Sequence, residues 1–502
     1  MKQIMDGCTA ATHVAFALSD VATIYPITPV ASMGETAQKW GMQGRKNYMG
    51  MPMSVKEMES ELGAAGATHG AAAAGALATT FTNSQGLMLM ISNMYKIAGN
   101  RLPVVFHVGA RSLATHALSI FGDHQDVMAT RATGFAFLCS TSVQEVMDLA
   151  TVAHLAALEG STPVCHFFDG WRTSNEMSTI DVIPYNDLFS LIDRKKVQAF
   201  RARALNPEHP VLRGSAQNPD VYFQNAEAQN PFYDRFPAIV QEKMDALAAV
   251  TGRQYHLFDY HGAADATTVV IAMGSSCKVA ELTVDYLNSH GYKAGVVTVH
   301  LFRPFSPEAL IKAIPPTVRT VVTLDRTKEP GADGEPLYKD VATALLTYGP
   351  GHFPSSLPGI MGGRYGLSSK DFTPAMVKAI LDEAAKPAPR RFFTVGITDD
   401  VTKLSLDVDS SFMLPVEGVT SAIFYGFGSD GTVGATRQAA SIIGDTEGMF
   451  AQAYFSYSAK KSGGYTISQL RFSKSPVEEE FGIEEADYVA CHKSAYLSLI
   501  HI

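Results

Sequence analysis

The sequence has little charge and no long apolar run, and each shortage excludes a class of protein. Charged residues make up 18% of the 502 residues, the formal net charge is −9, and lysine and arginine form no cluster. Nucleic acid is therefore not expected as a partner. No apolar run approaches the length of a membrane span, and the first residues show no signal-peptide pattern. We expect no membrane association.

Cysteine is scarce as well. The five cysteines are scattered and never form a Cys-x-x-Cys pair: Cys8, Cys139, Cys165, Cys277 and Cys491. This pattern predicts a reducing, cytoplasmic location. It also predicts no disulfide framework and no zinc or iron–sulfur site within this chain.

The length and the alternation of elements predict an α/β protein of about three domains. A strand at 134–139, a helix at 143–158 and a strand at 163–168 are typical of a parallel sheet covered by helices. Residues 185–262 are rich in Asn, Pro, Gln and Tyr. They predict a long irregular arm with one helix at about 237–251.

Regular α/β structure resumes after this arm. The pattern predicts strands at 267–273, 293–300 and 317–325, with a helix from Gly274-Ser275-Ser276 to about 289. Such a turn at a helix start could hold an anion. Residues 386–391 are predicted to be a linker.

Glu61 stands at the head of a helix made almost entirely of small residues. Of the 16 residues from 63 to 78, 13 are Gly or Ala, so another backbone or a flat ligand can come very close. A first-turn carboxylate is also favoured by the helix dipole. Position alone therefore favours an ordinary surface glutamate paired with the helix dipole.

Two other polar side chains are predicted at strand ends. Thr28 follows a strand at 22–25 and lies between Pro26 and Pro29, where a parallel sheet places ligands. Arg111 follows a strand at 102–108, and a guanidinium there suits a carboxylate held by two hydrogen bonds. The alternatives are a rigid turn with an incidental hydroxyl and a structural salt bridge.

The stretch Asp123-His124-Gln125-Asp126 contains three residues that could ligate a metal. Three ligands in one loop are weak evidence for a metal site, and we favour a hydrogen-bonded loop.

A strand at 420–425, a glycine-rich turn and a helix from about 435 predict a backbone cradle for phosphate. The spacing Gly426-x-Gly428-x-x-Gly431 also fits a dinucleotide-binding fingerprint. The acidic candidates, Asp445 and Glu447, come too early for that fingerprint.

Several longer motifs occur together, in this order along the chain: Tyr25–Pro29, Ser60–Gly66, Phe106–Leu113, Phe121–Met128, His166–Gly170, Leu324–Gly331 and Gly428–Gly434. Over residues 1–496 they closely resemble the pyruvate:ferredoxin (flavodoxin) oxidoreductase family. The resemblance implies oxidative decarboxylation of pyruvate with CoA to acetyl-CoA and CO2, with electrons passed to ferredoxin or flavodoxin.

The resemblance also implies a fold, of thiamine-diphosphate-binding type, with parallel sheets covered by helices on both faces and a partial third α/β domain. Residues 1–255, including an arm at about 185–255, would bind the pyrimidine of thiamine diphosphate. Residues 260–400 would form a transketolase C-terminal-like domain, and 415–496 an incomplete CoA-binding domain. Residues 497–502 are expected to be a non-native tail on an N-terminal fragment that is inactive alone.

The cofactors that the resemblance implies are thiamine diphosphate, Mg²⁺ and [4Fe–4S] clusters, with CoA as co-substrate. The ligands of Mg²⁺ and of the clusters are expected outside this chain, and a homodimer is implied.

Residue roles come from the same resemblance. Glu61 resembles the glutamate that hydrogen-bonds the aminopyrimidine ring. Thr28 resembles a threonine that binds substrate near the reactive carbon, and Arg111 an arginine that binds the pyruvate carboxylate. The residues that resemble a CoA-binding segment, in place of a dinucleotide site, are Gly428, Ser429, Asp430, Gly431, Thr432 and Lys460. The alternatives are another 2-oxoacid as substrate and a non-catalytic nucleotide-binding α/β protein.

Overall fold

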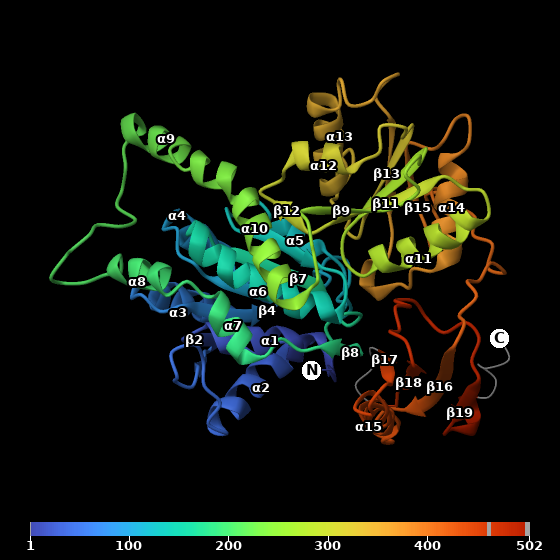
Figure 1. Ribbon diagram of the computed structural model, residues 1–502, viewed down its shortest axis with the longest axis horizontal. Helices are drawn as coiled ribbons and strands as arrows, with labels where there is room; N and C mark the ends of the chain where they lie inside the picture. Colours follow the sequence, from blue (N-terminus) through green and yellow to red (C-terminus); the bar gives the residue numbers. More distant parts are fainter. Residues whose placement is uncertain (1, 459–462, 497–502) are drawn as a thin grey trace.

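The computed structural model describes residues 2–458 and 463–496, and three sheets organise them (Figure 1). The first sheet has seven strands in the order β12 (Leu301–Arg303), β6 (Ala136–Ser140), β7 (Val164–Asp169), β5 (Val105–Ala110), β4 (Ala78–Thr82), β2 (Val21–Ile24) and β3 (Ser54–Glu57). All neighbours pair in parallel except β12 and β6. The carboxyl ends of β2 to β7 therefore meet at one edge.

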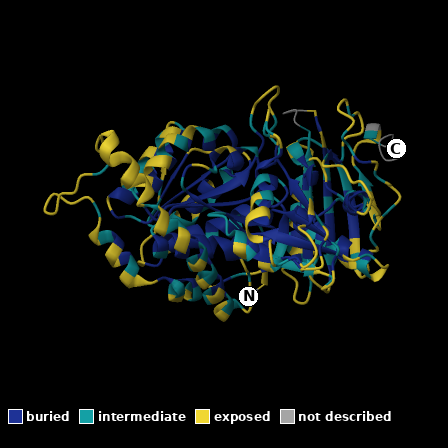
Figure 2. Ribbon diagram, turned by 90° about the horizontal axis from the view of Figure 1, so that it is seen from above, coloured by how far each residue is buried: buried dark blue, intermediate teal, exposed yellow. Residues whose placement is uncertain are grey.

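Helices cover this sheet, and its central strands are buried along their whole length (Figure 2). The first helices of the region are α1 (Gly7–Leu18), α2 (Ala31–Met42), α3 (Glu61–Ala73), α4 (Ser84–Gly99), α5 (Gln125–Thr130) and α6 (Val143–Gly160). Helix α1 packs against α2 and α6, and α3 packs against α4. Asp6 caps α1, because its carboxylate accepts a 2.8 Å hydrogen bond from Thr9 N. Parallel sheets require such cover.

The predicted irregular arm is mostly helical, so that prediction is wrong for much of residues 185–262. The chain forms α7 (Tyr185–Leu191), α8 (Arg194–Ala202), α9 (Pro219–Glu227) and α10 (Asn230–Thr251). The helix predicted at about 237–251 is confirmed as the later part of α10, which packs against α6 through a stripe of buried residues: Phe236, Val240, Met244 and Leu247. Helix α9 buries no residue and extends away from the body at the upper left of Figure 1.

The second sheet has six strands in the order β15 (Phe392–Thr394), β14 (Gly359–Arg364), β13 (Thr320–Asp325), β10 (Thr268–Ala272), β11 (Ala294–Val299) and β9 (Phe258–Gly262). All pairs are parallel except β9 with β11. Its helices are α11 (Ser276–Ser289), α12 (Pro307–Ala313), α13 (Pro336–Tyr348), the short 3₁₀ turn η1 (Leu367–Ser369) and α14 (Pro374–Ala384).

The third sheet is built from three separate parts of the chain. Its order is β1 (Lys2–Asp6), β8 (Met177–Asp181), β17 (Phe450–Tyr457), β18 (Tyr465–Ser473), β16 (Val419–Phe427) and β19 (Tyr488–Cys491). All pairs are antiparallel except β16 with β19. Helix α15 (Thr432–Gly444) packs on it, and η2 (Ser494–Tyr496) ends the described chain. The doubly wound parallel sheet of a dinucleotide-binding domain is thus absent from these described strands.

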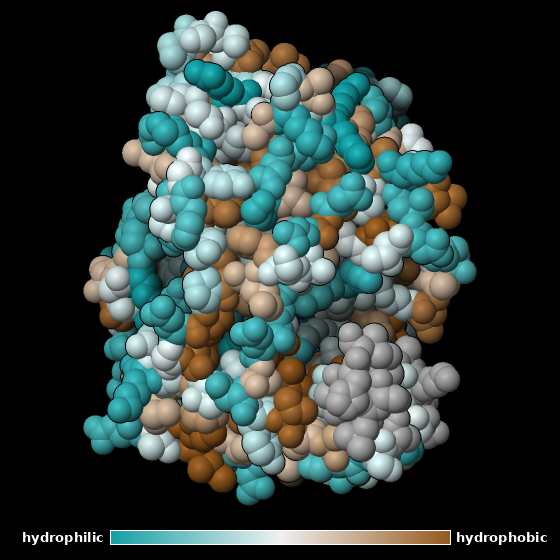
Figure 3. Space-filling view, turned by 90° about the vertical axis from the view of Figure 1, so that its right-hand side faces the viewer, coloured by the Kyte–Doolittle hydropathy of each residue, from teal (hydrophilic) through white to brown (hydrophobic). Residues whose placement is uncertain are grey.

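The sheets are α/β units as predicted, and the end formed by the second and third regions mixes hydrophilic and hydrophobic side chains (Figure 3). None of the helices in the described part of the chain combines the length and apolar character that a membrane span requires. Lys460 and the tail 497–502 lie outside the described residues, so the predictions made for them stay predictions.

Candidate active site

The carboxyl edge of the first sheet brings the three predicted catalytic residues to loops on one side. Thr28 follows β2, Glu61 follows β3, and Arg111 follows β5 directly. Parallel pairing of β2 with β3 and β4, and of β4 with β5, makes these loops neighbours. Parallel α/β sheets bind ligands at this edge.

Arg111 is held by main-chain oxygens. Its Nη1 donates to Thr28 O at 2.8 Å and its Nε donates to Ser119 O at 3.3 Å. The residue is 8% exposed, and no carboxylate among the described residues pairs with it. Burial lowers the pKa of the guanidinium, and the charge of Asp126 opposes that shift. The structural salt bridge is therefore excluded within the described chain, and Nη2 is free to bind an anion.

Thr28 is linked to Arg111 through its carbonyl, which leaves its side chain for other contacts. The residue is exposed, and its hydroxyl has no hydrogen-bond partner in the described part of the chain. This hydroxyl can donate to a group that the neighbouring guanidinium binds.

Glu61 is the first residue of α3, next to the capping residue Ser60, whose hydroxyl accepts a 3.2 Å bond from Gly63 N. At 8% exposure it is not the exposed surface glutamate that position alone allowed. A Cβ on Gly86 would lie 2.8 Å from Glu61 Cγ and 2.9 Å from Oε1. No described residue donates a hydrogen bond to the carboxylate, so it remains available to a ligand.

Two further residues at this edge were not predicted. Thr82 Oγ1 and Asn83 Oδ1 are buried and have no hydrogen-bond partner among the described residues. Asn83 Nδ2 donates to Ile27 O at 3.4 Å, and Thr82 Oγ1 lies 2.7 Å from the Cβ position of Gly86. Because a buried polar group without a partner is costly, such atoms mark places where a ligand can supply the missing bond. In the sequence, the threonines at the end of β4 were the feature that could have indicated these two residues.

Asp126 joins the loops that follow β4 and β5. Its Oδ2 accepts hydrogen bonds from Ser84 N at 2.7 Å and from Arg111 N at 3.0 Å. Burial raises its pKa to about 7. The stretch from Asp123 to Asp126 is therefore a hydrogen-bonded loop, as favoured, and this carboxylate positions Arg111.

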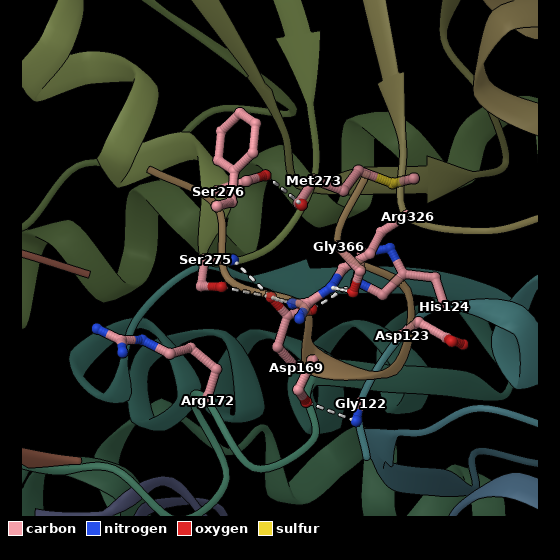
Figure 4. A network of polar contacts seen from close by, with 12 residues as sticks. Gly122, Asp123, His124, Asp169, Arg172, Met273, Ser275, Ser276, Arg326 and Gly366 are labelled. Carbon is pink, nitrogen blue, oxygen red and sulfur yellow. Dashed lines mark hydrogen bonds and ion pairs between the residues drawn. The ribbon is translucent and has the colours of Figure 1, made fainter. Parts of the chain in front are cut away.

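A second cluster at the same edge is centred on Asp169, the last residue of β7 (Figure 4). Arg326 Nη1 and His124 Nε2 each lie 2.6 Å from its carboxylate. Ser275 N and Oγ donate to it at 3.0 and 2.6 Å. Burial alone would raise the pKa of Asp169, but Arg326 and His124 hold it well below the usual range.

The turn at Gly274–Ser276 therefore does hold an anion, and the anion is the chain's own Asp169. Ser275 follows β10 and Arg326 follows β13. The strand order of the second sheet reverses between β10 and β13, which is where a doubly wound sheet places its ligand. This position in the second sheet is occupied from within the chain.

The glycine-rich turn lies between β16 and α15, as predicted. Ser429 and Gly431 have φ values of 75° and 90°. The Asp430 carboxylate accepts hydrogen bonds from Phe427 N at 2.7 Å and Thr432 N at 2.8 Å, and Gly428 N donates to Gly464 O at 2.8 Å. The N–H groups of Ser429 and Gly431 have no partner among the described residues, so they can bind a phosphate.

Contacts between rings connect this turn to the first sheet. Trp171, just after β7, donates from Nε1 to Ile120 O at 2.6 Å, and its ring lies 5.3 Å from that of Tyr457. Tyr457 pairs with Thr466 at the same end of the third sheet as the glycine-rich turn. The Arg111 loop and the turn are thus on adjoining parts of the molecule.

Comparison with protein families gives three matches in chain order. Residues 13–245 match "Pyruvate flavodoxin/ferredoxin oxidoreductase, thiamine diP-bdg", residues 266–366 match "Pyruvate:ferredoxin oxidoreductase core domain II", and residues 421–500 match "Pyruvate ferredoxin/flavodoxin oxidoreductase".

Curated relatives match along nearly the whole chain. A pyruvate:ferredoxin oxidoreductase of Moorella thermoacetica is 58% identical over 99% of this chain and 42% of its own length. A pyruvate-flavodoxin oxidoreductase of Enterobacter agglomerans is 53% identical over the same shares. The chain thus spans less than half the length of these relatives.

Among solved structures, a 2-oxoglutarate:ferredoxin oxidoreductase from Magnetococcus marinus with 2-oxoglutarate, coenzyme A and succinyl-CoA bound gives a TM-score of 0.55 at 18% identity. The match covers 77% of this chain and 65% of that one, and at this identity it speaks for the fold alone.

Proposed function

We propose that this chain, which belongs to the pyruvate:ferredoxin (flavodoxin) oxidoreductase family, forms part of an enzyme that converts pyruvate and CoA to acetyl-CoA and CO2. Electrons would pass to ferredoxin or flavodoxin. The observation that carries the proposal is a set of groups at one sheet edge that have no partner among the described residues: the Glu61 carboxylate, the Thr28 hydroxyl and Arg111 Nη2.

The residues at this edge fit thiamine diphosphate. Glu61 lies against Gly86, where any side chain would occupy the space of the carboxylate, and Thr82 Oγ1 and Asn83 Oδ1 are orphaned nearby. A flat ring with polar edges would supply the missing hydrogen bonds. When bound, the cofactor supplies the carbon nucleophile for decarboxylation.

Each residue has a distinct task in this proposal. Glu61 shares a proton with a ring nitrogen through Oε1 or Oε2, and its burial strengthens that bond. Arg111 binds the substrate carboxylate through Nη2, since its Nε and Nη1 are already held by main-chain oxygens. Thr28 donates its hydroxyl to the 2-oxo oxygen, and Asp126 keeps the Arg111 loop in place.

We assign CoA to the glycine-rich turn. Ser429 and Gly431 offer N–H groups that have no partner in the described part of the chain, at the start of α15, where a phosphate is favoured. Asp430 and Gly428 hold the turn through the bonds described above, and Thr432 binds His492 Nδ1 at 2.8 Å. Lys460 would add a cation to the CoA site.

The remaining parts of the enzyme are also proposals. Mg²⁺ and the [4Fe–4S] clusters would be held by residues outside this chain, the enzyme would be a homodimer, and it would work in the cytoplasm. Arg111 and Thr28 recognise the 2-oxo-carboxylate shared by many substrates, so another 2-oxoacid is the alternative substrate. A nucleotide-binding protein without catalysis would need only the glycine-rich turn. This alternative does not account for the polar groups around Glu61.

The test is pyruvate- and CoA-dependent reduction of a viologen dye by the full-length protein, without oxygen and with thiamine diphosphate and Mg²⁺. Glu61→Ala is expected to lower kcat at least about 100-fold, as for the loss of an acid–base group. The matched control is Glu59→Ala, which removes an exposed carboxylate two residues away and should retain full activity. Full activity in Glu61→Ala would contradict the role of Glu61. If the wild type were active only with another 2-oxoacid, that acid would replace pyruvate as the proposed substrate.

A further inference from the structure

A cavity of about 510 Å³ lies at the carboxyl ends of β13, β14 and β15 in the second sheet. It is lined by Lys328 together with residues 364–367, 370, 394–399 and 402. Its volume is within the range of about 300–1,000 Å³ that small-molecule sites occupy. The carboxyl ends of parallel strands are also where such sheets bind ligands.

The charge around the cavity favours an anion. Three cations, Lys328, Arg364 and Lys370, face one carboxylate, Asp399. Arg364 Nη1 is already 3.3 Å from Glu335. Lys328 and Lys370 are exposed, and neither forms a hydrogen bond or ion pair through its ammonium group with the described residues. Two unpaired ammonium groups are therefore available.

A buried hydroxyl at the cavity lacks a partner. Thr394, the last residue of β15, lines the cavity and is only 7% exposed. Its Oγ1 is buried with no hydrogen bond among the described residues. Native structures rarely leave such a group unsatisfied, so this hydroxyl is a second, independent indication of a ligand.

Part of the remaining wall is apolar, and Thr398 and Thr402 also line it. Leu367, Val395 and Ile397 contribute to it, and Ile397 is 48% exposed although it is a large aliphatic side chain. A ligand that covered these side chains would remove apolar surface from water. The lining therefore suits an organic molecule rather than a bare inorganic ion.

We propose that this cavity binds a small organic anion, with one carboxylate or phosphate group on an apolar body. Lys328 and Lys370 bind the anionic group, Thr394 supplies a hydrogen bond, and Leu367, Val395 and Ile397 cover the body. The site is separate from the Glu61 edge and does not depend on the function proposed above.

The test is titration calorimetry on the full-length protein with benzoate, phenyl phosphate and benzyl alcohol. The two anions separate a carboxylate site from a phosphate site, and the alcohol has a similar apolar body without charge. At least one anion should bind with a Kd below about 10 mM, and benzyl alcohol at least about tenfold more weakly.

The Lys328→Gln/Lys370→Gln variant should weaken anion binding at least about tenfold. Its matched control, Lys312→Gln/Lys474→Gln, removes two exposed lysines elsewhere and should bind like the wild type. Thr394→Val, with folding checked by thermal melting, should also weaken binding. Equal binding of benzyl alcohol, wild-type affinity in the Lys328/Lys370 variant, or no anion binding at about 10 mM would each overturn the proposal.

Discussion

The first and second parallel sheets present similar carboxyl edges, but their polar groups are used differently. In the first sheet, Glu61 and the hydroxyl of Thr28 are left without partners within the described chain. In the second, Ser275 and Arg326 converge on Asp169, which completes their bonds. A position where an α/β sheet usually binds a ligand can therefore be filled by the protein itself, as Asp169 does between β10 and β13. Groups without a partner among the described residues distinguish the positions that remain open, at Glu61 in the first sheet and at Thr394 in the second.

We expect the largest loss of stability when the ion pair between Arg326 and Asp169 is broken. Arg326→Met leaves the Asp169 carboxylate buried with fewer partners, and we expect a loss of about 3–5 kcal/mol in the free energy of unfolding. Urea denaturation measures it. The exposed Arg319→Met is the control and should change little. Asp169→Asn combined with Arg326→Met should cost less than the sum of the single variants, because both charges are then gone. Wild-type stability in Arg326→Met would show that Arg326 does not compensate the buried charge of Asp169.

Beside Glu61, we expect added side-chain volume to lower both stability and cofactor binding. Gly86→Ala places a Cβ within 2.9 Å of Glu61 and Thr82 atoms. We expect a cost of about 1–3 kcal/mol and reduced binding of thiamine diphosphate. Gly99→Ala, at the other end of α4, meets nothing within 4 Å and should be neutral or stabilising. Thermal unfolding and cofactor titration separate the two variants; identical behaviour would show that the space beside Glu61 is not tight.

The contributions of Asp126 and Asp169 to the free energy of unfolding should change with pH in opposite directions. Asp126 has a folded pKa of about 7, above its unfolded value of about 3.9. Its contribution to stability is therefore present at low pH and is lost as the pH rises towards 7, by about 1.4 kcal/mol per unit. Asp169 has a lowered pKa, so its contribution is present at neutral pH and is lost only as the pH falls below about 4.

The measurement is unfolding of the wild type and Asp126→Asn between pH 5 and 7.5. The stability of the wild type relative to the variant should fall as the pH rises. Asp234→Asn, which alters an exposed side chain on α10, should stay parallel to the wild type. A difference that does not change with pH would mean that Asp126 is ionised throughout.

Local patterns in the sequence were enough for much of the fold. Strands ending just before Arg111 and near Thr28, and a helix starting at Glu61, follow from hydrophobic periodicity and turn chemistry, which act over a few residues. The helix predicted at about 237–251 is part of α10, but α7, α8 and α9 were not predicted, because that part of the chain is rich in Asn, Pro and Gln. The roles of the predicted site residues remain proposals that the experiments above address.

The sequence by itself determined many of the helices and strands, the small-residue surface of α3 and the glycine-rich turn, because these depend on near neighbours. Only the tertiary structure decided that β1 and β8 complete the third sheet and that β12 joins the first. It also decided that Asp169 fills the turn at Ser275. Strand pairing and buried charge pairs join residues more than a hundred positions apart, and many partners satisfy the same local pattern until packing selects one.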